Sequence, residues 1–137
     1  MISKSIEETI EIGSKIAKDL KPGDVVALIG DLGSGKTVLT KGIARGLGVK
    51  ETRYVNSPTF VIIKEHKGNI PLYHFDLYRL NKTGMYDEIG FEEYFYGDGV
   101  TVIEWADKIE KLLPKKRIEV RLSVAGEDKR KIEIKSI

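Results

Sequence analysis

The sequence predicts a single α/β domain over residues 1–137, in which a mixed, mainly parallel central sheet carries antiparallel hairpins and is covered by few helices. An apolar run of β-branched character, "VVALIG" at 25–30, is typical of a fully buried parallel strand. A glycine-rich loop and a helical pattern follow it directly. Two strictly alternating segments, 117–124 and 129–137, predict a closing antiparallel hairpin around "AGEDK".

The composition is that of a globular protein with one hydrophobic core. Hydrophobic residues make up 41% of the chain and charged residues 32%, and the length suffices for one core. No apolar run approaches the ~20 residues of a membrane span and no basic, then apolar leader opens the chain, so we expect a cytoplasmic protein. Cysteine is absent, which excludes disulfides and thiolate metal sites.

The other elements follow from periodicity and from end signals. Residues 5–20 predict an amphipathic helix with Ser5 and Glu8 as its capping box. After the glycine-rich loop, apolar residues recur every four positions until Gly48 ends a second helix. The remaining elements, in chain order, are two strands of a hairpin joined by "KGN" within 59–80, one or two short helices within 87–99, a buried strand at 100–105 and a short helix at 106–113.

The loop "GDLGSGKT", residues 30–37, matches the P-loop or Walker A motif in every required position. Its glycines let backbone N–H groups point at phosphate oxygens, and the helix beginning near Lys36 turns its positive end to the same place. We expect Lys36 to reach the β- and γ-phosphates and the Thr37 hydroxyl to coordinate Mg²⁺. The predicted nucleotide contacts in this loop are Asp31, Leu32, Gly33, Ser34, Gly35, Lys36 and Thr37.

A P-loop protein also needs an acid at the end of a neighbouring buried strand, where it holds the metal through the metal's water shell. Glu104 in "VTVIEW" occupies that place. Burying a carboxylate at the end of an apolar strand is costly without a cation, which favours a metal-linked acid over a glutamate that faces solvent. Trp105 points to the opposite face by strand alternation, and a place in the core, an interface and a nucleotide contact all stay open for it.

A second acid, Asp76, lies in "LYHFDLYR". Period-two alternation places Leu72, His74 and Asp76 on one face of this strand. Asp76 is a candidate for ordering the attacking water or the waters of the metal, and a salt bridge to Arg79 or to a lysine is nearly as well supported. His74 and His66 show no metal-ligand spacing, and we interpret His74 as a packed residue.

The choice of nucleotide and the rate of its hydrolysis depend on the residues around the P-loop. Thr59, in "SPTF", is a candidate γ-phosphate sensor of the kind found in switch loops. The segment "NKTG" at 81–84 resembles the guanine-reading NKxD motif but ends in Gly84, so we expect ATP rather than GTP. No arginine-rich lid segment is visible and Arg79 is a weak arginine-finger candidate, so we expect hydrolysis to be slow without a partner.

Three classes of function stay open on these residues: an ATPase switch within a larger assembly, a P-loop kinase of a small molecule, and a nucleotide-binding scaffold. The missing lid favours the first class. The net charge of +2 is too small to indicate nucleic-acid binding by itself. Basic residues concentrate after position 114, where a solvated edge hairpin explains them more simply than an RNA site does.

Four motifs in this order, "GDLGSGKT", "VNSPTF", "YHFDLYR" and "VIEWAD", resemble the bacterial TsaE (formerly YjeE) family, and the resemblance covers essentially the whole chain. It implies an ATPase required for forming threonylcarbamoyladenosine in tRNA beside the anticodon. Such proteins act with TsaD and TsaB, which transfer the threonylcarbamoyl group after TsaC makes the activated adenylate. Contact with tRNA would then be indirect, through the complex.

The resemblance also implies what each motif does. It assigns phosphate and Mg²⁺ binding to Lys36 and Thr37, the second metal-linked acid to Glu104, switch and catalytic roles to Thr59 and Asp76, and a place beside the site to Trp105. The chain would consume ATP to activate or reset the transferase complex and would not itself transfer the threonylcarbamoyl group.

Overall fold

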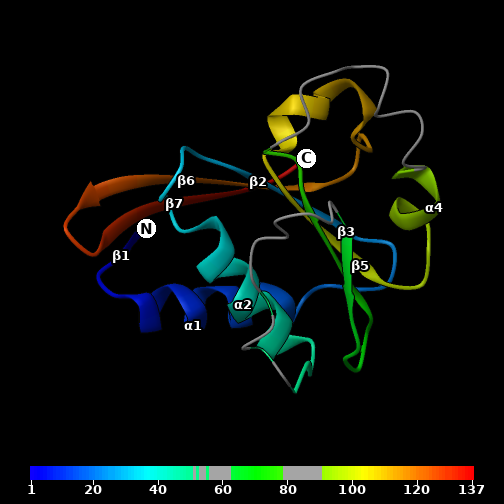
Figure 1. Cartoon of the computed structure of the whole chain (residues 1–137), viewed down its shortest axis with the longest axis horizontal. Coiled ribbons are helices and arrows are strands. Elements are labelled where there is room, and N and C mark those ends of the chain that lie inside the picture. The colour runs from blue at the N-terminus through cyan, green and yellow to red at the C-terminus, as the bar shows by residue number, and fades with distance from the viewer. Residues whose placement is uncertain (51, 53–54, 56–62, 79–90) are drawn as a thin grey trace.

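The computed structural model describes residues 1–50, 52, 55, 63–78 and 91–137. Within these ranges the strands are β1 (Ile2–Ser3), β2 (Val25–Ile29), β3 (Ile63–His66), β4 (Leu72–Asp76), β5 (Val100–Glu104), β6 (Ile118–Gly126) and β7 (Lys129–Ser136). The helices are α1 (Ile6–Ala17), α2 (Lys36–Gly46), α4 (Phe91–Phe95) and the 3₁₀ helix η3 (Ala106–Leu112). Figure 1 shows these helices on the two faces of one sheet, with α1 and α2 together on one face.

The described strands form this sheet in the order β1–β7–β6–β2–β5–β4–β3. Its centre is parallel, because β2 pairs with both β5 and β6, and β4 pairs with β5. The outer pairs β3–β4, β6–β7 and β1–β7 are antiparallel. The expected α/β fold with a mixed, mainly parallel central sheet and antiparallel hairpins is therefore confirmed. The two-residue strand β1 was not predicted, because it is too short to show an alternating pattern.

Helices α1 and α2 lie against each other on their face of the sheet (Figure 1). The Ser5 side chain accepts a hydrogen bond from the Glu8 N–H at 3.1 Å, as a capping box requires. The Glu8 carboxylate accepts from the N–H of Lys4 rather than from that of Ser5. A Cβ atom on Gly42 of α2 would lie 2.2 Å from the carbonyl oxygen of Ile10 of α1. Only glycine permits so close an approach of the two helices.

The opposite face of the sheet is covered by α4 and η3. The ring centroid of Phe75 on β4 lies 5.4 Å from that of Phe91 and 6.4 Å from that of Phe95, both on α4. Phe91 and Phe95 are both buried and belong to the core on this face. The short helix expected at 106–113 is a 3₁₀ helix, preceded by Trp105 in the left-handed conformation at φ 61°. Within the described ranges, no helix has the length and apolar character needed to cross a membrane.

The carboxyl ends of β2, β5 and β4 meet at one edge of the sheet, because these three strands are parallel neighbours. The P-loop follows β2, Glu104 ends β5, and Asp76 ends β4. The register places Asp76 opposite Glu104, and Glu104 opposite Leu28. Ligands of open α/β sheets bind at this edge. The fold thus brings residues from three separate motifs to one place.

Candidate nucleotide-binding site

The loop between β2 and α2 has the backbone geometry of a phosphate cradle. Gly33 and Gly35 adopt left-handed conformations, with φ of 80° and 103°, which residues with a Cβ rarely adopt. The N–H of Ser34 bonds to the carbonyl of Asp31 at 3.1 Å and closes the turn. Gly35 is the N-cap of α2 and has no side chain with which to cap the first N–H groups of the helix. Those N–H groups and the positive end of the helix favour an anion at this position.

The Lys36 ammonium lies inside this loop. It donates to the carbonyl oxygens of Gly30 at 2.6 Å and Asp31 at 2.8 Å, and lies 3.4 Å from the Ser34 hydroxyl. Burial lowers the pKa of Lys36 below its ordinary value, although the charges of Glu104 and other nearby acids act in the opposite direction. A partly desolvated cation of this kind gains strongly from a phosphate anion.

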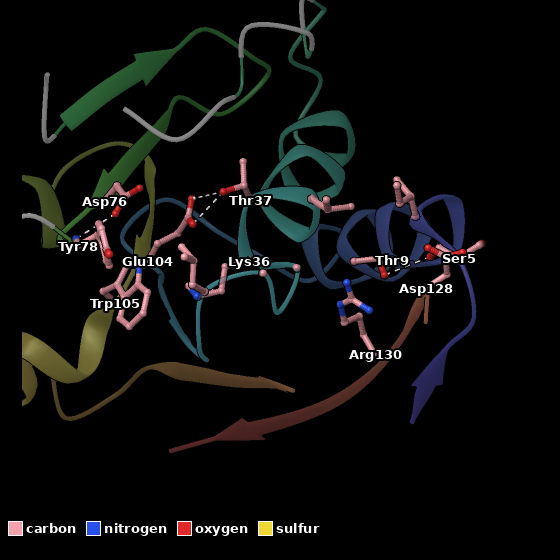
Figure 2. Close-up of a pocket in the computed structure, with 15 residues that line it drawn as sticks. Ser5, Thr9, Lys36, Thr37, Asp76, Tyr78, Glu104, Trp105, Asp128 and Arg130 are labelled. Carbon is pink, nitrogen blue, oxygen red and sulfur yellow. Dashed lines mark hydrogen bonds between the residues drawn. The ribbon is translucent and has the colours of Figure 1, made fainter. Parts of the chain in front are cut away.

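Thr37 and Glu104 are in direct contact. The Thr37 hydroxyl donates to Oε1 of Glu104 at 2.9 Å and lies 3.2 Å from its Oε2 (Figure 2). On its other side, Oε2 of Glu104 lies 2.5 Å from Nε2 of His74. Glu104 is only 2% exposed, so the alternative of a strand-end glutamate facing solvent is wrong. His74 was interpreted from sequence as a packed residue; it is fully buried and also contacts this acid.

Asp76 lies at the end of the neighbouring strand and is also buried. Its carboxylate accepts a hydrogen bond from the Tyr78 N–H at 3.0 Å. Its negative charge acts on Lys36, whose pKa it raises in part. Alternation along β4 is as expected, since Tyr73 and Phe75 pack into the α4 side of the core while His74 and Asp76 face the other way. The proposed partner Arg79 lies outside the described residues.

Trp105 joins the core on the α4 side and also reaches the site. It packs against the cluster that includes Ile103 and Ala106, as strand alternation predicts. The Lys36 ammonium lies 4.2 Å from the centroid of its ring, and the Tyr78 ring lies 5.1 Å away on centroids. The left-handed backbone at Trp105 ends the strand there. Core packing and contact with the site are therefore both present in one residue.

These groups line a pocket of about 310 Å³. Among the predicted site residues, those that line it are Leu32, Gly33, Gly35, Lys36, Thr37, Asp76, Glu104 and Trp105. Asp31 and Ser34 do not line it and contact Lys36 instead. Thr59 lies outside the described residues.

The pocket also contains residues that the sequence did not point to. Ser5, Ile6 and Thr9 line it from the start of α1, and Asp128 and Arg130 line it from the turn between β6 and β7 and the start of β7. Figure 2 shows Ser5, Thr9, Asp128 and Arg130 at the end of the pocket away from Asp76. They belong to the two ends of the chain, and no local pattern marks them as site residues, because the folded sheet brings them beside the P-loop.

The donor set fits Mg²⁺ bound together with phosphate. Among the described residues, no three His, Cys, Asp or Glu side chains are grouped so that they could hold a metal ion by themselves. Mg²⁺ usually takes one or two protein oxygens and completes its shell with water and substrate phosphates. The hydroxyl of Thr37 and the carboxylate of Glu104, in contact at the positive end of α2, are such a pair.

Comparisons with known proteins show the family to which the chain is similar. The family model for threonylcarbamoyl adenosine biosynthesis protein TsaE matches residues 3–132. The tRNA threonylcarbamoyladenosine biosynthesis protein TsaE of Bacillus subtilis is 49% identical over 132 residues, which cover 96% of this chain and 81% of that protein. Its counterpart in Treponema pallidum is 38% identical, with 97% of each chain covered. The crystal structure of Bacillus subtilis YdiB superposes with a TM-score of 0.84 at 42% identity, covering 100% of this chain and 84% of that one. This chain belongs to the TsaE family of tRNA threonylcarbamoyladenosine biosynthesis proteins.

Proposed function

We propose that this chain is a Mg²⁺-dependent ATPase that activates or resets the TsaB–TsaD complex during threonylcarbamoyladenosine formation in tRNA. One observation carries the proposal: Lys36, Thr37, Glu104 and Asp76 line a single pocket at the carboxyl edge of the sheet. These are the charged and polar groups that transfer of a phosphoryl group from Mg²⁺-nucleotide requires. The role in tRNA modification follows from membership of the family.

The phosphates would lie in the loop at the start of α2. The Lys36 ammonium is now bonded to the neutral carbonyls of Gly30 and Asp31. Phosphate oxygens are charged and accept stronger hydrogen bonds than carbonyls do, so Lys36 would turn to them. Thr37 and Glu104 would hold Mg²⁺, which when bound neutralises charge that develops on the phosphates.

The attacking water would be oriented by Asp76. A carboxylate buried at the end of a strand beside the P-loop, with one oxygen already held by the Tyr78 N–H, keeps a fixed direction. Orientation of a water by such a group is the contribution that hydrolysis needs beyond charge neutralisation. Thr59 stays a candidate for contact with the γ-phosphate.

The far end of the pocket suits a nucleoside. Ile6 supplies an apolar surface, and the aliphatic stem of Arg130 lies next to Gly35, since a Cβ on that glycine would lie 3.7 Å from Arg130 Cγ. The hydroxyls of Ser5 and Thr9 and the carboxylate of Asp128 line the same end. Pockets that pair an apolar surface with a few polar groups bind ligands of this kind.

The mouth of the pocket supports a partner that covers it. Leu32, Ile6 and Tyr78 line the pocket, yet are 75%, 58% and 48% exposed. Exposed apolar side chains gathered around a site indicate a protein interface. A partner bound there would exclude water from the nucleotide, and we propose the TsaB–TsaD complex as that partner.

ATP turnover by the purified chain, alone and with TsaB and TsaD, tests the proposal. We expect slow turnover alone and a rise of at least tenfold with the partners. Lys36→Ala should abolish both, while Lys41→Ala, on the same helix and outside the pocket, should leave both unchanged. Fast turnover that ignores the partners would rule out the switch. ATP consumption that depends on a metabolite, with phosphate transferred to it, would favour the alternative of a small-molecule kinase.

A further inference from the structure

His74 is placed unusually for a residue that only fills space. It lies on β4, is 0% exposed, and stands two positions before Asp76. Its Nε2 lies 2.5 Å from Oε2 of Glu104, whereas its buried Nδ1 has no hydrogen-bond partner among the described residues. An imidazole with an unpaired buried nitrogen costs free energy that an apolar ring of the same size would not cost.

The contact fixes which imidazole nitrogen carries hydrogen. An ionised carboxylate only accepts hydrogen bonds, so Nε2 of His74 must be the donor to Glu104. Its Nδ1 is then an acceptor without a partner among the described residues, which in a buried site is tolerated better than an N–H without one. The neutral imidazole with its hydrogen on Nε2 therefore donates to Glu104 and leaves no buried N–H group of the ring without an acceptor.

The two oxygens of Glu104 are thereby held by different groups. Thr37 makes its shorter contact to Oε1, and His74 approaches only Oε2. A glutamate has three rotatable side-chain bonds, and a single contact leaves the plane of its carboxylate free to turn. Two donors on opposite oxygens define that plane, and burial to 2% exposure keeps water from replacing either donor.

We propose that His74 is a positioning residue that aims the carboxylate of Glu104 at the Mg²⁺ bound with nucleotide. This inference rests on the proposed function, since it gives Glu104 a metal-linked role. Groups that hold a metal-linked side chain from behind typically change metal affinity or activity by about 10–100-fold when they are removed. His74 does not touch the nucleotide pocket itself and acts through Glu104.

Two substitutions at position 74 distinguish the effect of losing the hydrogen-bond donor from the effect of changing the shape of the side chain. His74→Phe keeps a ring of similar size and removes the donor. His74→Gln places an amide N–H at the same number of bonds from the backbone as Nε2 and restores the donor. His66→Phe is the matched control, because His66 is the other histidine in the chain, is also buried, and lies on β3 outside the nucleotide pocket.

The probe is a fluorescent, methylanthraniloyl-labelled ADP, whose affinity for the protein increases when Mg²⁺ is added. The measured quantity is the Mg²⁺ concentration at which half of this increase in affinity is reached. In EDTA all variants should bind this probe within about threefold of wild type. We expect His74→Phe to need about 10–100-fold more Mg²⁺. The His74→Gln and His66→Phe variants should stay within about threefold of wild type. An unchanged Mg²⁺ midpoint in His74→Phe, or an equal shift in His74→Phe and His74→Gln, would overturn the inference.

A measurement on the wild-type chain covers the case in which His74→Phe does not fold. The ¹⁵N chemical shifts of the His74 ring should show hydrogen on Nε2 and none on Nδ1, with and without Mg²⁺ and ADP. Hydrogen on Nδ1 alone would overturn the inference. A wild-type chain that binds no nucleotide would contradict the proposed function itself, whereas binding with the wrong tautomer or an unchanged Mg²⁺ midpoint would contradict only the role of His74.

Discussion

The hydroxyl of Thr37 lies 2.9 Å from Oε1 of Glu104, although 67 positions separate the two residues in the chain. The contact exists because β2 and β5 are parallel neighbours, so the first turn of α2 and the end of β5 lie at the same edge of the sheet. This contact joins the P-loop to the motif that contains Glu104. The two candidate Mg²⁺ ligands therefore already lie together.

Removal of the Thr37 hydroxyl tests this pairing. Thr37→Val keeps the shape and removes the oxygen, so we expect ADP binding in the presence of Mg²⁺ to weaken at least tenfold while binding in EDTA changes little. Thr37→Ser retains the oxygen and should bind as wild type within about threefold. Equilibrium titration with the labelled ADP measures both conditions. Wild-type binding by Thr37→Val in Mg²⁺ would show that this hydroxyl does not serve the metal.

Gly42 provides a test of the helix packing. In an exposed helix, Gly→Ala stabilises by about 1 kcal/mol. Here the added Cβ would lie 2.2 Å from the carbonyl oxygen of Ile10, which forces α1 and α2 apart. We expect Gly42→Ala to reduce the free energy of unfolding by about 1–3 kcal/mol. Urea denaturation measures it, with the exposed Arg45→Ala on the same helix as control. A more stable Gly42→Ala variant would contradict the observed packing.

Local patterns predicted most of the fold. The P-loop, the buried strands and the closing hairpin each carry their signal within ten or so residues, as glycine spacing, apolar runs or strict alternation. Alternation along β4 also placed His74 and Asp76 on the same face correctly. The short strand β1 was not predicted, because two residues are too few to show an alternating pattern. Its pairing with Lys131 also depends on the opposite end of the chain.

Long-range contacts account for what the sequence could not predict in the site. Arg130 appeared only as one of several basic residues in the tail, yet it lies beside Gly35 of the P-loop. Its position depends on the placement of β6 next to β2, which no local pattern encodes. The contact between His74 and Glu104 likewise needs the register of β4 on β5. The sequence could place each residue on its strand but not beside its partner.

The hairpin of β6 and β7, which carries many of the basic residues after position 114, is expected to contribute little to contact with tRNA. Lys129 and Lys131 are exposed, and Lys131 pairs with Glu133 at 3.0 Å, so its charge is partly balanced. Charge reversal of both lysines should leave the salt dependence of assembly with TsaB, TsaD and tRNA unchanged. Each lost phosphate contact would lower the slope of log affinity against log salt by about 0.7–0.9. A decrease of that size in the slope would show that the hairpin contacts the tRNA. Arg130 is left intact because it lines the candidate nucleotide pocket.

His66 makes the stability of the fold depend on pH. Burial lowers its pKa to about 4, and the nearby His74 and Lys64 act in the same direction. In the unfolded chain its pKa returns to about 6.5, so between these values the unfolded state binds a proton that the folded state does not. The stability contribution is therefore complete above pH 6.5 and is lost as the pH falls toward 4.

We expect wild type to lose about 1–2 kcal/mol more unfolding free energy between pH 7.5 and pH 5 than His66→Leu, in which no group titrates at this position. Nε2 of His66 has no hydrogen-bond partner among the described residues, so the substitution breaks no described hydrogen bond of that nitrogen. Urea denaturation at the two pH values gives the difference. Protonation of carboxylates contributes equally to both proteins and cancels. Equal losses in the two proteins would mean that His66 becomes protonated within the folded state at its ordinary pKa.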